Sequence, residues 1–176
     1  MIVINIFGVP GSGKSTMASY IFYKLKSNKI NCELVTEVAK DAVWDRNNKA
    51  LTNQMYITGN QCYRIERLKD EVDVVITDSP LMLQPIYYRL NGLPEPDMFE
   101  IILYKMFEQY QNINLILPMP DGYDTNGRVH TEQQLANIFD KMLDILDKYE
   151  IQTIPIDHNT DSVDELLNKI IKIMKK

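Results

Sequence analysis

The sequence predicts an α/β domain, a three-layer α/β/α sandwich in which helices cover both faces of a five-stranded, mostly parallel sheet. Short apolar, β-branched segments alternate along the chain with longer segments that have helical periodicity. The strand segments are apolar at nearly every position, which is typical of strands buried on both faces. No repeat, low-complexity segment or Pro/Gly/Ser-rich linker divides residues 1–176, so we expect one domain.

The first elements are expected to form a strand, a loop and a helix. Residues 2–7 are an apolar, β-branched run that predicts a buried strand. Apolar residues at every fourth position predict a helix over residues 17–25. A glycine-rich segment, residues 8–16, lies between the two. The order strand, glycine-rich loop and helix therefore opens the chain.

The next elements repeat the alternation. Residues 32–35 predict a second short strand, and Thr36 is expected to cap a helix that ends near residue 44. After a turn at residues 45–48, apolar residues three or four apart predict a long helix over about residues 51–70. These elements fit a strand followed by two helices that pack on the sheet.

The middle of the chain contains the third and fourth strands. Residues 72–78 are apolar until the run ends in an acidic residue, which predicts a strand with a carboxylate at its carboxyl end. Helices are expected at residues 81–90 and 99–110, separated by a loop rich in Gly and Pro. Residues 113–118 predict the fourth strand.

The last part of the chain begins with a polar loop at residues 119–130. A capping box at residues 131–134 then opens a strongly amphipathic helix that runs to about residue 146. Residues 152–156 predict the fifth strand, which Pro155 restricts to a sheet edge or a strand end. A terminal helix is expected to run from about residue 162 to residue 174. In such a sheet the ligand crevice lies at the carboxyl ends of the strands.

The glycine-rich segment matches the pattern G-x-x-x-x-G-K-[ST], which is a phosphate-binding loop when it joins a strand to a helix. Its backbone amides and the positive end of the following helix dipole attract phosphate, and the lysine reaches the β- and γ-phosphates. An ordinary Gly/Ser turn is the alternative, and the strand before the segment and the helix after it favour the phosphate-binding loop. The residues expected to bind ATP are Gly8, Pro10, Gly11, Ser12, Gly13, Lys14, Ser15 and Thr16, with Ser15 also placed to ligate Mg²⁺.

Composition limits the classes of partner. The chain carries a net charge of −5, which argues against a polynucleotide partner because no basic surface would release counterions. Cys32 and Cys62 have no metal-site or redox spacing, and we interpret them as free thiols. The sequence has no signal peptide and no apolar stretch that could span a membrane, so a cytoplasmic protein is predicted.

Two acidic residues follow neighbouring strands and could act on a bound triphosphate. Glu37, at the end of the second strand, is placed to accept a proton from an acceptor hydroxyl; a solvated or helix-capping glutamate is the alternative. Asp78, at the end of the third strand, is placed to hold Mg²⁺ or its waters; a carboxylate at the start of the next helix is the alternative.

Residues 34–44 resemble the stretch after the second strand of deoxynucleoside kinases, in which a glutamate matching Glu37 accepts the proton of the sugar hydroxyl. The same stretch is similar to the nicotinamide-riboside kinase domain of bacterial NAD regulators and to related small AAA-type ATPases of phages, which carry Ala-Arg where this chain has Ala39-Lys40. This resemblance implies a P-loop kinase fold with the strand order 2-3-1-4-5.

The same resemblance suggests residues for the acceptor side. Gln61 and Arg64 match the kinase helix whose glutamine reads a nucleobase edge, although a solvated polar face fits the spacing equally well. Trp44 could stack on a base or belong to the core. The segment 77–80 departs from the Asp/Glu-Arg-Ser pattern of these kinases. The role of the missing arginine must therefore pass to Arg64, Arg67 or Arg89, or be vacant.

The polar loop at residues 119–130 lies where P-loop kinases carry a lid. Its single arginine, Arg128, is expected to close over the transferring phosphoryl group. His158 follows the fifth strand, where relatives hold adenine, but no residue-level match supports a role for it.

The sequence therefore predicts a P-loop kinase that uses ATP and Mg²⁺ to phosphorylate a small hydroxyl acceptor, a nucleoside or nicotinamide riboside. In this mechanism Lys14, Glu37, Asp78 and Arg128 are the catalytic residues, and Glu37, Trp44, Gln61 and Arg64 bind the acceptor. A nucleoside-monophosphate kinase is the nearest alternative, and an ATP-binding module or slow NTPase that acts through a partner is another. The sequence leaves open whether the chain forms a homodimer.

Overall fold

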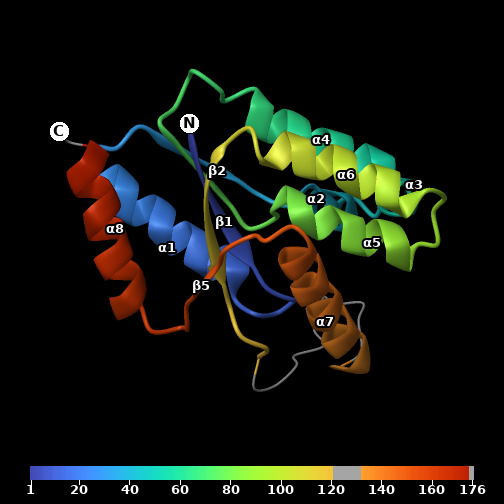
Figure 1. Ribbon diagram of the computed structural model, residues 1–176. Coiled ribbons are helices and arrows are strands. Elements are labelled where there is room, and N and C mark those ends of the chain that lie inside the picture. The colour runs from blue at the N-terminus through green and yellow to red at the C-terminus, as the bar shows by residue number, and fades with distance from the viewer. Residues whose placement is uncertain (121–131, 175–176) are drawn as a thin grey trace.

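The sheet is built around β1, the central strand of a computed structural model that describes residues 1–120 and 132–174 (Figure 1). β1 pairs with β3 on one side and β4 on the other, β2 pairs with β3, and β5 pairs with β4. All four pairings are parallel and the order is β2-β3-β1-β4-β5, so the expected strand order is confirmed. The strands are β1 (Ile2–Phe7), β2 (Cys32–Val35), β3 (Val74–Thr77), β4 (Gln111–Ile116) and β5 (Ile154–Pro155).

Helices lie on both faces of this sheet, which makes the predicted three layers (Figure 1). α1 and α8 pack on the face that presents Ile4 and Ile6 of β1. The 3-10 helix η1 and helices α4 to α7 pack on the face that presents Val3 and Phe7. The helices are α1 (Lys14–Ser27), α2 (Val38–Trp44), α3 (Asn48–Leu51), α4 (Gln54–Glu66), η1 (Leu81–Leu83), α5 (Gln84–Leu90), α6 (Pro96–Phe107), α7 (Glu132–Lys148) and α8 (Asp161–Met174).

The chain between β2 and β3 differs from the expected long helix at residues 51–70. A short helix, α3, comes first, and α4 begins at Gln54 because the Asn53 side chain accepts a hydrogen bond from the Tyr56 amide at 3.0 Å. An asparagine in this position favours the start of a helix over its continuation. α4 then ends at Glu66, four residues earlier than predicted.

The start of α2 also differs from the prediction. Thr36 does not cap this helix: Glu37 occupies the N-cap position and its side chain makes no capping hydrogen bond. The amide of Val38 instead donates to the Gln61 Oε1 atom at 3.1 Å, so α4 supplies the cap. The Glu37 carboxyl group therefore takes no part in capping α2.

β4 begins two residues earlier than the apolar run predicted. Gln111 and Asn112 are polar, yet they pair with Ile2 and Val3 of β1 and so extend the ladder. The Leu117 amide still donates to the Phe7 carbonyl at 3.0 Å after the strand has ended. Pairing with the full length of β1, rather than apolarity, therefore sets where β4 starts.

The remaining expectations concern the two cysteines, membrane-spanning helices and the lid loop. Cys32 and Cys62 are free and buried, as predicted, and burial raises the pKa of the Cys62 thiol to about 11. Among residues 1–120 and 132–174, no helix is long and apolar enough to cross a membrane. The predicted lid loop lies outside the described residues apart from its first two positions, so Arg128 has no described place.

Candidate functional site

The loop between β1 and α1 is shaped by glycines with positive φ angles. Gly8 has φ 153°, and a Cβ atom at this position would lie 2.4 Å from the Ser12 Oγ atom. Gly13, at the N-cap of α1, has φ 83°, and a Cβ atom there would lie 3.0 Å from the His158 ring. Both positions therefore require glycine, one by close approach to the loop itself and one by conformation.

The start of α1 has the properties of a phosphate-binding site. Its N-cap residue has no side chain, and the first turn contains no acidic residue. The Lys14 ammonium group donates to the Val9 carbonyl at 2.8 Å, so this cation is held against the loop. The helix dipole and Lys14 both place positive potential where the phosphates of a nucleotide would lie.

Ser15 and Asp78 lie beside this loop and place a hydroxyl and a carboxylate next to each other. The Ser15 hydroxyl donates to Asp78 Oδ2 at 2.5 Å. Asp78 is 4% exposed, and its other oxygen, Oδ1, is buried with no hydrogen-bond partner in residues 1–120 and 132–174. A buried carboxylate oxygen without a partner next to a hydroxyl fits Mg²⁺, which prefers oxygen ligands.

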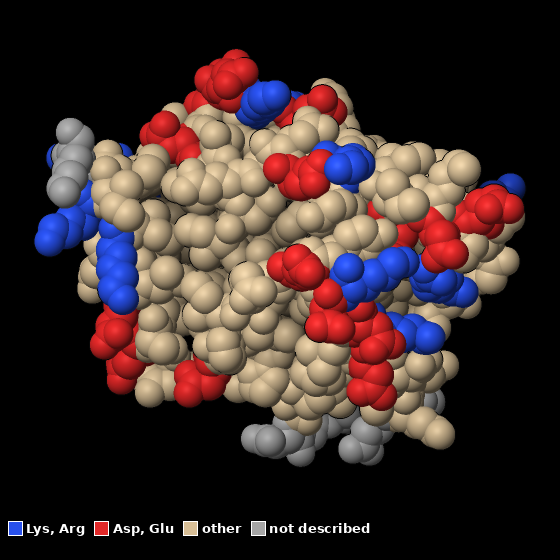
Figure 2. All heavy atoms as spheres, in the orientation of Figure 1, with Lys and Arg blue, Asp and Glu red and all other residues tan. Residues whose placement is uncertain are grey.

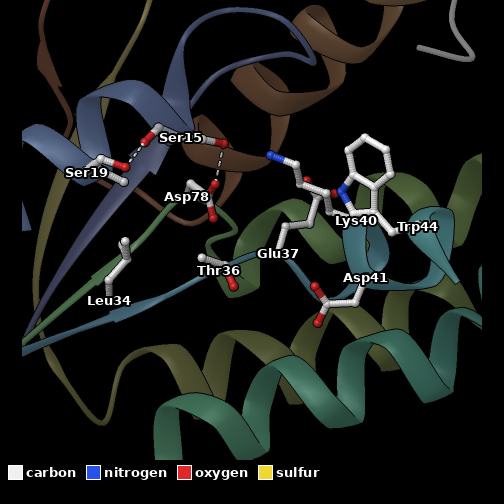
Figure 3. Close-up of a pocket in the computed structure, with 10 residues that line it drawn as sticks. Ser15, Ser19, Leu34, Thr36, Glu37, Lys40, Asp41, Trp44 and Asp78 are labelled. Carbon is white, nitrogen blue, oxygen red and sulfur yellow. Dashed lines mark hydrogen bonds between the residues drawn. The ribbon is translucent and has the colours of Figure 1, made fainter. Parts of the chain in front are cut away.

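A pocket of about 310 Å³ opens next to Ser15 and Asp78, between α1, β2 and α2 (Figure 3). Its walls carry Ser15, Ala18, Ser19, Leu34, Thr36, Glu37, Lys40, Asp41, Trp44 and Asp78. We call it the charged pocket. It brings together four of the sequence-predicted site residues, Ser15, Glu37, Trp44 and Asp78, which come from three different segments of the chain.

Glu37 has the electrostatic environment of a proton acceptor. Burial raises the pKa of its carboxyl group, and the negative charges of Asp78 and Asp41 act in the same direction. The cations of Lys14 and Lys40 lower the pKa. Because desolvation is the largest of these effects, Glu37 holds a proton more tightly than an ordinary glutamate and is a stronger base when deprotonated.

Tyr87 of α5 does not line the charged pocket but lies near Glu37, and the sequence interpretation did not identify it. Burial raises the pKa of its hydroxyl group, and the nearby Glu37 carboxylate raises it further. Tyr87 therefore stays protonated and lies in the same electrostatic environment as Glu37. No pattern in the sequence marks it, because its proximity to Glu37 depends on where α5 packs in the fold.

Gln61 and Arg64 are placed differently from the other predicted residues. Gln61 is 0% exposed, and its side chain bonds to the Val38 amide and, at 3.5 Å, to the Thr77 hydroxyl. Arg64 forms an ion pair with Asp41 and donates to the Thr36 carbonyl at 3.3 Å. Neither residue lines the charged pocket. In this structure they hold α2 in position beside it.

A second pocket, of about 530 Å³, lies on the β5 side of the phosphate loop. It is mainly apolar and is lined by Ile116, Leu117, Pro118, Phe139, Pro155, Ile156, Asp157 and Ser162. We call it the apolar pocket. His158 directly follows Asp157, which lines this pocket, and the His158 ring lies close to Gly13. The apolar pocket is therefore next to the phosphate loop. The loop thus lies between a charged pocket and an apolar one.

Comparison with protein families identifies one matching model. A family model described as an AAA domain matches residues 3–164, which includes the phosphate loop and both pockets. A comparison with curated protein sequences gives no match.

Solved structures show the same fold over nearly the whole chain. Thymidylate kinase from Ehrlichia chaffeensis is 15% identical with a TM-score of 0.65, and the similarity covers 98% of each chain. The NadR protein, solved in complex with NR, is 15% identical with a TM-score of 0.64. That similarity covers 99% of this chain but 52% of the NadR chain, so this chain spans about half of NadR. Both comparisons establish the fold.

Proposed function

The chain belongs to the AAA domain family, and on that premise we propose that it is a kinase that transfers the γ-phosphoryl group of ATP to a small hydroxyl acceptor. The acceptor we propose is a nucleoside or nicotinamide riboside. One observation carries the proposal: the Glu37 carboxyl group lines the same pocket as Ser15 and Asp78, beside the phosphate loop. A base on one wall and phosphate ligands on the other is the arrangement that phosphoryl transfer to a hydroxyl requires.

The donor nucleotide would lie along the phosphate loop. The amides at the start of α1 and the Lys14 ammonium group would bind its β- and γ-phosphates. The apolar pocket on the β5 side would accept the adenine ring, because apolar walls suit a flat aromatic base. Ser15 and Asp78 would ligate Mg²⁺, which would neutralise phosphate charge when bound.

The acceptor would lie in the charged pocket with its hydroxyl group toward the γ-phosphate. Glu37 would take the hydroxyl proton while the hydroxyl oxygen forms its bond to the γ-phosphorus and the bond to the β-phosphate oxygen breaks. The products are a phosphorylated acceptor, ADP and a protonated Glu37. Trp44, which lines the pocket and is 76% exposed, is placed to stack on the base of the acceptor. Arg128 would add positive charge when the acceptor is bound.

The described cations favour an acceptor without a phosphate group over a nucleoside monophosphate. Arg64 is paired with Asp41, and Arg89 is paired with Asp97 and Glu100. Neither arginine lines the charged pocket, whose described walls carry three carboxylates and one lysine. Anionic walls repel a phosphate ester, whereas a neutral nucleoside or the cationic ring of nicotinamide riboside avoids this cost. The NR bound in the NadR neighbour agrees with this choice.

The distribution of charge on the protein surface disfavours a polynucleotide acceptor. On the face that Figure 2 shows, lysine and arginine are interspersed with aspartate and glutamate rather than gathered into a basic area. With a net charge of −5, the chain lacks the electrostatic term on which most nucleic-acid binding depends.

The proposal is tested by measuring ADP release from MgATP in the presence of nucleosides, nucleoside monophosphates and nicotinamide riboside, each added separately. We expect an unphosphorylated acceptor to stimulate ADP release, with mass spectrometry detecting the phosphorylated product. Stimulation by monophosphates alone would instead support a nucleoside-monophosphate kinase. ADP release that no acceptor changes would support a slow NTPase and would overturn the proposed function.

A further inference from the structure

Lys40 lies on the same face of α2 as Glu37 and Trp44. The three residues are three and four positions apart, so their side chains share one side of the helix. All three line the charged pocket. This spacing along α2 therefore places the Lys40 cation between the proposed base, Glu37, and the exposed Trp44.

Lys40 is the one cationic residue among the described residues that line the charged pocket. Nearby cations are engaged elsewhere: Lys14 bonds to the Val9 carbonyl, and Arg64 pairs with Asp41. Arg67, at the end of α4, and Arg89, which pairs with Glu100, do not line the pocket either. Within residues 1–120 and 132–174, Lys40 forms no ion pair within 4 Å.

The Lys40 side chain extends across the pocket. Figure 3 shows it reaching from α2 toward the wall that carries Ser15 and Asp78. Its positive charge lowers the pKa of the Glu37 carboxyl group, in keeping with the position of both residues on the wall of one pocket. The four-carbon stem of lysine is flexible, which lets the ammonium group of Lys40 move toward a phosphate bound beside Ser15 in the same pocket.

The charges around the proposed γ-phosphate position are unbalanced without this lysine. Glu37, Asp41 and Asp78 place three carboxylates on the walls, and the triphosphate adds further negative charge. Phosphoryl transfer depends on neutralising the charge spread over the transferred group. Lys14 approaches the phosphoryl group from the loop side, and a cation on the acceptor side would add positive charge to the oxygens that face the acceptor.

We propose that Lys40 binds the γ-phosphate of the donor from the acceptor side and remains on the phosphoryl group during transfer. This rests on the proposed function. During the step the acceptor oxygen bonds to the γ-phosphorus, the bond to the β-phosphate oxygen breaks, and Glu37 takes the hydroxyl proton. Lys40 stays protonated throughout and contributes positive charge and hydrogen bonds to the phosphoryl oxygens.

The test separates binding from catalysis. Calorimetry would measure the affinity of wild type, Lys40→Gln and Lys40→Arg for MgADP and for magnesium β,γ-imido-ATP. Lys49→Gln, which removes an exposed lysine of α3 outside the pocket, is the matched control. We expect Lys40→Gln to weaken imido-ATP binding about tenfold or more with MgADP unchanged, because the loss of a charged hydrogen bond has this size. Lys40→Arg should retain most of the affinity.

Turnover gives an independent readout. With a stimulating acceptor, Lys40→Gln should lower kcat by roughly a hundredfold while the KM of the acceptor stays near the wild-type value. Equal losses of MgADP and imido-ATP affinity, or unchanged imido-ATP affinity together with unchanged kcat, would overturn the proposal. If no acceptor stimulates the wild type but Lys40→Gln selectively loses imido-ATP affinity, the γ-phosphate contact stands and the kinase assignment fails.

Discussion

The two pockets beside the phosphate loop differ in almost every chemical respect. On the β2 side, the charged pocket carries Glu37, Lys40, Asp41 and Asp78 within about 310 Å³. On the β5 side, the apolar pocket of about 530 Å³ is lined mainly by apolar side chains and proline rings, with Asp157 as its one charged residue among the described ones. The same loop therefore has a charged side and an apolar side.

This difference separates two tasks that a kinase must perform. The apolar pocket offers contact area but no group that could move a proton, so it suits the part of the donor that does not react. The charged pocket offers a desolvated carboxyl group and a cation beside the proposed metal ligands, so it suits the reacting hydroxyl. Loss of the proposed base in the charged pocket should therefore affect kcat without affecting affinity for ATP, and changes in the apolar pocket should affect affinity for ATP.

The largest effect is expected for Glu37→Gln, which removes the proposed base and keeps the size of the side chain. Acceptor phosphorylation should fall by about 10²–10⁴-fold, the usual contribution of general base catalysis. Affinity for MgATP should remain because the phosphate loop is unchanged. The measurements are acceptor-stimulated ADP release and calorimetric titration with MgATP.

The matched control is Glu33→Gln, a carboxyl group on β2 that does not line the charged pocket. The acceptor-stimulated ADP release and the MgATP affinity of this variant should both stay near the wild-type values. A Glu37→Gln enzyme that loses MgATP affinity as strongly as turnover would show that this residue supports nucleotide binding, and the division between the two pockets would fail.

The next effect is expected for Lys14→Ala, which alters the loop that both pockets share. Loss of one charge-stabilising donor typically costs about 2.7–4 kcal/mol in the barrier, so turnover should fall a hundredfold or more. Lys26→Ala, in the last turn of the same helix, removes an equal charge far from the loop and should have little effect. Steady-state kinetics checks both. Near-normal turnover by Lys14→Ala would refute the role of this lysine.

A smaller and different effect is expected for Phe139→Ala, which removes an aromatic wall of the apolar pocket. The KM for ATP should rise about tenfold, the size expected for part of an aromatic contact of 1–3 kcal/mol, while kcat changes little. Phe22→Ala removes another half-buried phenylalanine, on α1 and outside both pockets, and controls for loss of stability. A fall in kcat with an unchanged KM for ATP would contradict the assignment.

Much of this arrangement could be predicted from the sequence because it depends on local patterns. The loop is a contiguous motif, the strand ends bring Glu37 and Asp78 to one edge, and the strand order followed from a family resemblance that the AAA domain match and the solved folds confirm. The helix boundaries were less accurate where a side chain decides them. Asn53 divides the expected long helix, and nothing in its apolar spacing marks that break.

The parts that the sequence could not predict depend on packing between distant segments. Gln61 has the spacing of a base-reading glutamine, but α4 packs so that its side chain caps α2 instead. Arg64 faces Asp41 rather than the pocket. Tyr87 lies near Glu37 through the placement of α5, which no short-range pattern specifies, whereas the spacing of Lys40 from Glu37 and Trp44 places it on the same face of α2.

The smallest effect, a shift in pH dependence, tests the charged pocket most directly. A base must be deprotonated to act, so kcat/KM for the acceptor should rise with pH through the pKa of Glu37. Burial and the charges of Asp78 and Asp41 raise this pKa, and Lys14 and Lys40 lower it, while the protonated Tyr87 faces the same carboxyl group. We call the rise of kcat/KM on the acid side of this pH profile the acid limb. Its midpoint should therefore lie above the usual pKa of glutamate, about 4.3.

Two variants should move this limb in opposite directions. Lys40→Gln removes a cation that lowers the pKa of Glu37, so the limb should move to higher pH, whereas Asp41→Asn removes an anion that raises it, so the limb should move to lower pH. Lys40→Arg keeps the charge and should leave the limb in place. If both neutral variants moved it in the same direction, or neither moved it, the limb would report another group and Glu37 would not be the base.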